Sequence, residues 1–124
     1  MNASMNELLT YFLNGLDEIL AKFEEFFESY RIEVLKEATC LLSMLGMVYL
    51  HGFTQIKHSI LPSSAYEASV MIRKKIRDIE LRGLREDDVE YVKEIYSFFK
   101  FIAEKIRSGE YEKGLTEMKR NKNS

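Results

Sequence analysis

The side chains best suited to bind a transition metal are Cys40, His51 and His58. A thiolate and two imidazoles are ligands that Zn²⁺ accepts. They fall roughly on one side of a predicted helix, but they are eleven and seven residues apart. Ligands so far apart along one helix cannot share an ion whose bonds are about 2 Å long. We therefore predict no metal site and no cofactor, and interpret the three as part of a packed stripe.

Sequence motifs of common enzyme classes are missing. The chain has no glycine-rich phosphate loop, no H-E-x-x-H, no paired E-x-x-H of a di-iron bundle and no nucleophile motif. Small helical ribonucleases of the HEPN group are similar in size, and their motif places an arginine four to six residues before a histidine. Here the only arginine before either histidine is Arg31, which is far too distant. We therefore predict that the protein is not an enzyme.

Basic side chains gather in one part of the sequence. The 124-residue chain has a net charge of −2, yet between residues 57 and 85 seven lysines and arginines stand against three acids. The seven are Lys57, Arg73, Lys74, Lys75, Arg77, Arg82 and Arg85. Such a surface can hold RNA phosphates without reading the base sequence. The alternative is a helix face whose charges are only solvated.

Apolar residues outside the predicted core stripes are candidates for subunit contacts. Tyr91, Phe98 and Phe101 could be covered by other helices of the chain, by another subunit or by stacked RNA bases. A second stripe on the first helix consists of Leu13, Leu20 and Phe27. It predicts burial on two sides, either by a neighbouring subunit or because a long helix crosses a small bundle.

The elements that position these groups are predicted to be helices. Hydrophobic residues make up 46% of the chain, and one proline and six glycines leave few turns for an all-β fold. We predict an all-α fold, a compact bundle of four long helices plus a short C-terminal helix. Residues 1–120 form a single helical-bundle domain, and residues 121–124 form a frayed tail.

Nothing in the sequence predicts export or membrane insertion. A lone cysteine fits a reduced compartment. The N-terminus does not have the form of a signal peptide. The longest nearly apolar run, about a dozen residues, is shorter than the roughly 20 needed to cross a bilayer. We expect a cytoplasmic protein with no membrane partner and no small-molecule substrate.

The first two predicted helices follow from apolar spacing and end signals. A stripe in steps of three and four runs from Met5 to Tyr30, after a capping box that starts at Ser4. The second helix is predicted from about Ile32 to Leu61, because the residue before Pro62 is pushed out of the helical region. Its nearly apolar stretch, residues 41–53, predicts a buried central helix.

The third predicted helix starts at a second capping box, formed by Ser64 and Glu67, and stops at Gly83. Its core side consists of Ala65, Ala68, Ile72, Ile76 and Ile79. The opposite face of this helix carries Arg73, Lys74 and Arg77, with Lys75 and Arg82 at its flanks, so the pattern predicts a basic outer surface.

The fourth predicted helix opens at Asp87, which has cap spacing with Glu90, and stops at Gly109. Its core stripe consists of Val89, Val92, Tyr96, Phe99, Ala103 and Ile106. Residues 110–120 are predicted to form the short C-terminal helix.

Two patterns share their order and separation with a known family. The first is Tyr30, the pair Leu41-Leu42, then Gly46-Met47, and Phe53 seven residues after the glycine. The second is the run of residues 98–106, with Lys100, Ala103 and Glu104 in place. These stretches resemble the small all-α subunit of type III-B CRISPR effector complexes, the fifth protein of the Cmr set. The chain departs from the family pattern at three positions, Thr39, Leu45 and Tyr49.

The resemblance implies a non-catalytic structural subunit of an antiviral ribonucleoprotein, the Cmr complex. Its partners would be the other subunits, copies of itself, and the guide and target RNA, while a different subunit cleaves the target. Lys100 is the one basic residue that the family pattern adds to the RNA-contacting set. The alternative is a protein–protein adaptor or inhibitor that binds no RNA and uses the Tyr91, Phe98 and Phe101 face.

Overall fold

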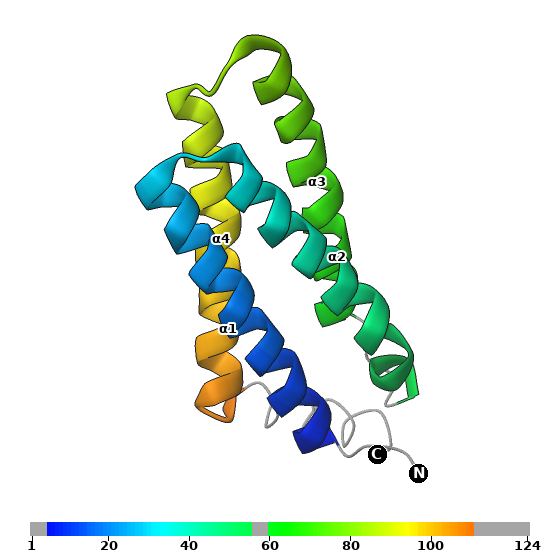
Figure 1. Ribbon diagram of the computed structural model, residues 1–124. Helices are drawn as coiled ribbons and strands as arrows, with labels where there is room; N and C mark the ends of the chain where they lie inside the picture. Colours follow the sequence, from blue (N-terminus) through cyan, green and yellow to red (C-terminus); the bar gives the residue numbers. More distant parts are fainter. Residues whose placement is uncertain (1–4, 56–59, 111–124) are drawn as a thin grey trace.

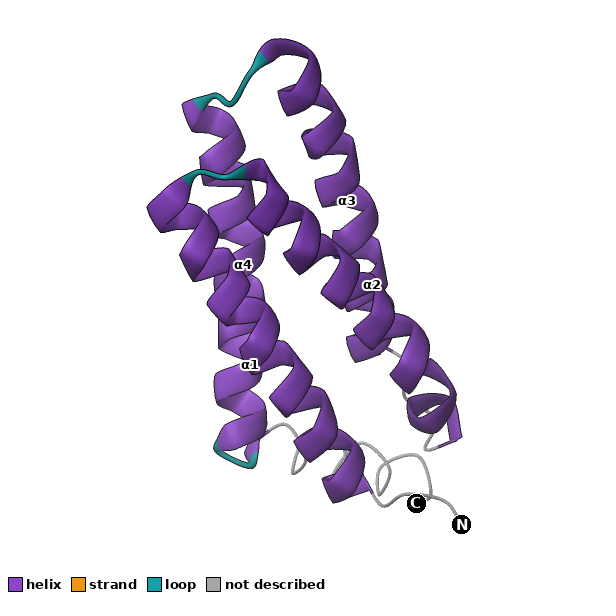
Figure 2. Ribbon diagram, viewed as in Figure 1, coloured by secondary structure: helices purple, strands orange, loops and turns teal. Residues whose placement is uncertain are grey.

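The structure is a computed structural model that describes residues 5–55 and 60–110. It contains four helices, α1 (Met5–Ser29), α2 (Ile32–Gln55), α3 (Ile60–Arg82) and α4 (Glu86–Arg107), and these described residues include no strand (Figures 1 and 2). The all-α prediction is therefore confirmed. Ser4, Lys57, His58 and the part of the predicted C-terminal helix after Glu110 lie outside the described residues.

The helices form a bundle in which neighbours in sequence run in opposite directions (Figure 1). α2 packs against both α1 and α3, and α4 packs on α1 and, more lightly, on α3. Within the described residues α1 does not pack on α3, so these two helices occupy opposite corners of the bundle. Each helix therefore keeps one face for the core and one for solvent.

The core is built mainly from the predicted stripes. Its largest fully buried apolar side chains are Phe12, Phe23, Phe26, Phe99, Leu16, Ile19, Leu35, Leu42, Ile72 and Val92. All five apolar residues predicted for the core side of α3 are buried, which confirms that stripe. On α4 the prediction holds except at Tyr96, which is half-buried and meets the rings of Phe23 and Phe27 edge-on, at centroid distances of 6.3 and 5.4 Å.

Small side chains fill the contact between α2 and α3. The buried set on the two helices includes Ala38, Thr39, Ser43, Ala65, Ala68 and Ser69. Short side chains allow two helix backbones to approach closely. The buried hydroxyl of Thr39 donates to the Leu35 carbonyl of its own helix at 2.7 Å, so its burial leaves no polar group unsatisfied.

The predicted boundary between the second and third helices is wrong. α2 ends at Gln55, not at Leu61, and Pro62 lies in the first turn of α3. A proline is accepted there because the amide hydrogens of a first turn have no acceptor within the helix. Ser64 is consequently inside α3 and does not cap it.

The predicted end of the first helix is also wrong, because Tyr30 is not part of it. Tyr30 is exposed and has a φ of +54°, in the left-handed region. Its amide donates to the Phe26 carbonyl at 2.7 Å and closes α1. Glycine usually occupies such a position, so a tyrosine here carries backbone strain.

The prediction that residues 41–53 form a buried central helix holds for only one face of the part whose side chains the structure describes. Leu42 and Leu45 are buried, but the outward face of the same helix exposes Met44, Met47 and Val48. An almost continuous apolar run cannot reveal which of its faces meets solvent. Side chains beyond Val48 in this stretch lie outside the described part of the chain.

Three exposed ion pairs connect neighbouring helices. They join Lys22 to Glu37 at 2.8 Å, Lys36 to Glu80 at 2.6 Å and Arg107 to Asp17 at 2.7 Å. Pairs of this kind contribute about 0–1 kcal/mol each, so the apolar core dominates the stability. Within the described residues, no helix combines the length and the apolar character needed to cross a membrane.

Candidate RNA-binding face and subunit surfaces

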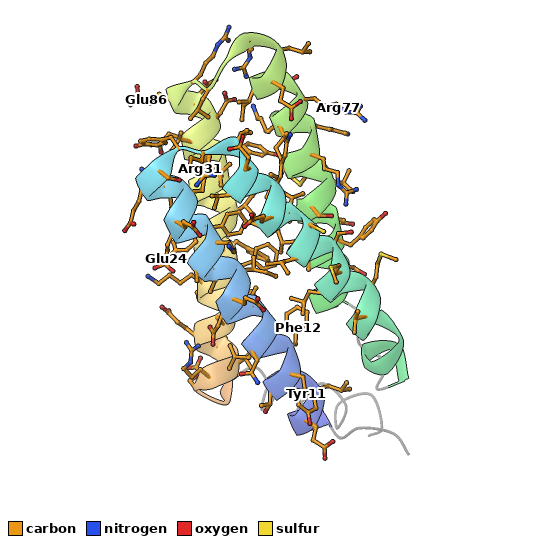
Figure 3. The ribbon with its side chains drawn as sticks, in the orientation of Figure 1. Tyr11, Phe12, Glu24, Arg31, Arg77 and Glu86 are labelled. Carbon is orange, nitrogen blue, oxygen red and sulfur yellow. The ribbon has the colours of Figure 1, made fainter. Side chains whose placement is uncertain are left out.

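Three of the predicted basic residues form a continuous outer surface on α3. Arg73, Lys74 and Arg77 are exposed on the side away from the buried stripe. None of the three has an ion-pair partner among the residues that the structure describes. We call these three residues the α3 basic face. Figure 3 shows Arg77 projecting from α3 away from the bundle.

Two other predicted basic residues are held by a buried carboxylate. Asp88 is fully buried, and its two carboxylate oxygens accept hydrogen bonds from Nη1 and Nη2 of Arg82, both at 2.9 Å. The Lys75 ammonium lies 3.7 Å from the same carboxylate and 4.9 Å from the centre of the Tyr91 ring. Arg82 and Lys75 therefore have much less freedom than the α3 basic face to bind an external phosphate.

The Asp88 carboxylate also caps α4. It accepts a hydrogen bond from the Arg85 amide at 3.0 Å, so the predicted cap at Asp87 and Glu90 is wrong. The Arg82 hydrogen bonds lower the pKa of Asp88 from 3.8 to about 2, and the Arg85 amide contributes to this shift although burial opposes it. The Arg85 side chain itself is exposed, at the end of the bundle formed by the α3–α4 turn.

Lys100 does not join the α3 basic face. It lies between α1 and α4, where its ammonium is 5.7 Å from the centre of the Tyr96 ring. A pocket of about 200 Å³ there is lined by Asp17, Leu20, Glu24, Tyr96, Lys100, Ala103, Glu104 and Arg107. Three of these residues are acids, so a phosphate would meet carboxylates as well as bases. The lining contains no serine, cysteine or histidine that could act as a nucleophile or general base.

The aromatic residues of α4 divide into a half-buried and an exposed set. Tyr91 is half-buried beside Lys75, whereas Phe98 is 49% exposed and Phe101 is 54% exposed. The helices that the structure describes therefore leave about half of each phenylalanine exposed. A neighbouring protein and stacked bases are two of the coverings expected from sequence for this pair.

The second stripe of α1 packs largely within the chain. Leu20 is buried in the core, and Leu13 and Phe27 are half-buried against it. A long helix crossing a small bundle accounts for this burial. Leu20 presents very little surface to a neighbouring subunit, so an interface at this stripe would rest on Leu13 and Phe27.

Opposite charges occupy opposite corners of the bundle. The exposed acids of α1 are Glu7, Asp17, Glu18, Glu24, Glu25 and Glu28. Figure 3 shows Glu24 projecting from α1 on one side of the molecule and Arg77 projecting from α3 on the other. A polyanion would therefore be attracted to the α3 side and repelled from the α1 side.

Two features of the candidate site were not predicted from sequence. The first is the Asp88 cluster, because three consecutive acids at positions 86–88 gave no sign of which one turns inward. The second is the exposure of the outer face of α2. Cys40 lies exposed on that helix, and the described residues contain no group of three potential metal ligands.

Comparisons of the chain with protein-family models, with curated proteins and with solved structures give no match.

Proposed function

We propose that this protein is a non-catalytic structural subunit of a type III-B CRISPR ribonucleoprotein in antiviral defence. In this proposal it packs against neighbouring subunits and contacts the backbone of the guide and target RNA. The proposal includes a cytoplasmic location and the compact bundle of four long helices with a short C-terminal helix. The family resemblance of residues 30–53 and 98–106 supplies the biological setting.

The observation that carries the RNA contact is the α3 basic face. Arg73, Lys74 and Arg77 are exposed, adjacent and without ion-pair partners among the described residues, on the corner opposite the acidic α1. Phosphate contacts of this type give affinity without base specificity. Arg85 lies at the end of the same helix–turn unit and can extend the surface.

The first experiment is an affinity purification of the tagged protein from its native cell, with and without ribonuclease. We expect repeat-derived guide RNA and the other complex subunits in the untreated sample. Partner proteins recovered without any guide RNA in either sample would refute the CRISPR assignment.

The second experiment tests the RNA contact with matched charge reversals. Arg73→Glu with Arg77→Glu should weaken binding to the recovered guide–target duplex by roughly tenfold or more, and lower the slope of log affinity against log salt by roughly two. Arg31→Glu with Lys93→Glu changes the net charge equally at exposed positions outside the α3 basic face and is the control. If both double variants weaken RNA binding equally, the α3 basic face has no specific role in that binding.

Exposed Phe98 and Phe101 favour a second candidate, an adaptor or inhibitor that binds only protein. Exposed aromatic side chains are frequent anchors of protein interfaces. This candidate predicts partner binding that survives ribonuclease treatment and is lost in Phe98→Ala. Unchanged partner recovery with Phe98→Ala would exclude this face as the anchor.

A further inference from the structure

An apolar groove runs between α1 and α2, on a face that the proposed RNA contact does not use. It has a volume of about 170 Å³ and is lined by Gly15, Glu18, Ile19, Leu41, Met44, Leu45 and Val48. Gly15 allows α1 and α2 to pack closely at the groove, because a Cβ at that position would lie 2.7 Å from Cδ1 of Leu45. A cavity of about 150 Å³ accommodates benzene, so the groove has room for one large apolar side chain.

Exposed apolar residues extend the groove along α2. Met47 is 66% exposed and Val48 is 67% exposed, and Met44 next to them is also exposed. The positions 44, 47 and 48 share one face of the helix. The contacts Lys22–Glu37 and Gly15–Leu45 fix the antiparallel register of the pair, which brings exposed Tyr11 of α1 level with this patch. A contiguous apolar patch of this kind marks an interaction site more often than scattered residues do.

The charges around the groove are unbalanced and negative. Glu18 lines the groove and has no ion-pair partner among the described residues. The nearby base, Lys22, is shared by two acids, Glu37 at 2.8 Å and Glu25 at 3.6 Å. An RNA phosphate or an anionic lipid surface would therefore be repelled from this face.

These features favour a particular kind of partner. Flexible methionines adapt to varied apolar side chains, and an apolar groove suits the apolar face of an amphipathic helix. The negative charge beside this groove favours a helix with basic flanks. In a two-fold contact a second copy would present this same negatively charged face, which does not complement it.

We propose that the α1–α2 groove binds a helical segment of another protein, in which apolar side chains at helical spacing are flanked by lysines or arginines. One anchor side chain enters the groove, a second covers Met47 and Val48, and the basic flank faces Glu18. This interaction is independent of the RNA contact on α3, so either one can hold without the other.

The probe is a fluorescent leucine–lysine peptide of about 14 residues, roughly four helical turns, with the same peptide carrying glutamate for lysine as its control. We expect the lysine peptide to bind at least tenfold more tightly by fluorescence anisotropy. Met44→Ser with Val48→Ser should weaken binding at least tenfold. Glu18→Lys should weaken it more than Glu24→Lys, which makes the same charge change outside the groove.

The remaining control is Leu81→Ser, at an exposed apolar position on α3, and it should leave peptide binding unchanged. All substituted residues are exposed, and circular dichroism verifies that each variant is folded. Equal binding of both peptides, or an unchanged affinity in the Met44 and Val48 variant, overturns the proposal. So does sedimentation evidence that the groove is occupied by a second copy and that the same variant dissociates it.

Discussion

Replacing Asp88 by asparagine should lower the free energy of unfolding by about 2 kcal/mol at neutral pH. The carboxylate receives two hydrogen bonds from Arg82 and one from the Arg85 amide, and it lies fully inside the protein. Asparagine has nearly the same shape and can still accept the amide hydrogen bond. The substitution therefore removes the charge and one acceptor while it preserves the packing.

Two considerations about the Arg82–Asp88 pair set the order of this magnitude. Breaking a buried ion pair costs about 3–5 kcal/mol, but the Arg82 side chain is 26% exposed and can recover part of this in water. The lowering of the Asp88 pKa from 3.8 to about 2 corresponds to about 2 kcal/mol at 1.36 kcal/mol per pKa unit. Both free energies are small compared with the stabilisation by the apolar core, but large compared with the contribution of an exposed ion pair.

The pH dependence of this contribution follows from the direction of the shift. Because the folded state has the lower pKa, it binds fewer protons than the unfolded state between these values. The stabilisation is therefore fully present above pH 4 to 5 and is lost as the pH falls towards 2. At pH 3 about half of it should remain.

The assay is urea denaturation followed by circular dichroism at a series of pH values from 3 to 7, for the natural protein and Asp88→Asn. The expected fall in the free energy of unfolding at neutral pH is about 2 kcal/mol, which in a thermal melt corresponds to a melting temperature lower by roughly 8 °C. Asp87→Asn, an exposed neighbour, is the control and should change stability by less than about 0.5 kcal/mol. If the two asparagine variants are equally stable, or if their difference does not narrow towards pH 3, the role assigned to Asp88 is wrong.

Two further predictions concern the backbone around α1. Gly15→Ala should change the free energy of unfolding by less than about 1 kcal/mol, because the helix propensity of alanine offsets the shift forced on Leu45, whereas Gly15→Val should cost about 1–3 kcal/mol by overpacking. If Gly15→Ala and Gly15→Val have equal free energies of unfolding in urea, the close approach of Leu45 to Gly15 is contradicted. Tyr30→Gly should be more stable than Tyr30→Ala by about 1 kcal/mol, because only glycine relieves the left-handed φ of +54°. The thermal midpoints of both variants test this, and a more stable alanine variant would argue against strain at Tyr30.

The buried stripes of the helices could be predicted because apolar spacing records which side of each helix faces the core. The α3 stripe from Ala65 to Ile79 is an example, and the α3 basic face on its opposite side followed from the same pattern. Pro62 shows that sequence patterns predict helix boundaries less well than buried stripes. A proline is compatible with a position just after one helix and with the first turn of the next, so its presence alone could not place the boundary.

The parts of the candidate site that escaped prediction depend on contacts between helices. Asp88 turns inward because Arg82 of the preceding helix reaches it, which the spacing within α4 cannot show. Because Arg82 is hydrogen-bonded to Asp88, it has less freedom to take part in the basic surface that the sequence predicted. Met44 and Met47 are a different case, because their apolar character was read as burial although they face solvent.

The order in which the helices pack has a consequence for biosynthesis. Among the described helices, α1–α2, α2–α3 and α3–α4 are each neighbours in the sequence, and only the contact of α4 with α1 joins distant parts of the chain. Proteins dominated by such local contacts fold quickly, in roughly microseconds to milliseconds, far faster than a ribosome adds one residue. The first three helices can therefore assemble during translation. The side of α1 that receives Tyr96, at Phe23 and Phe27, stays uncovered until α4 has left the ribosome.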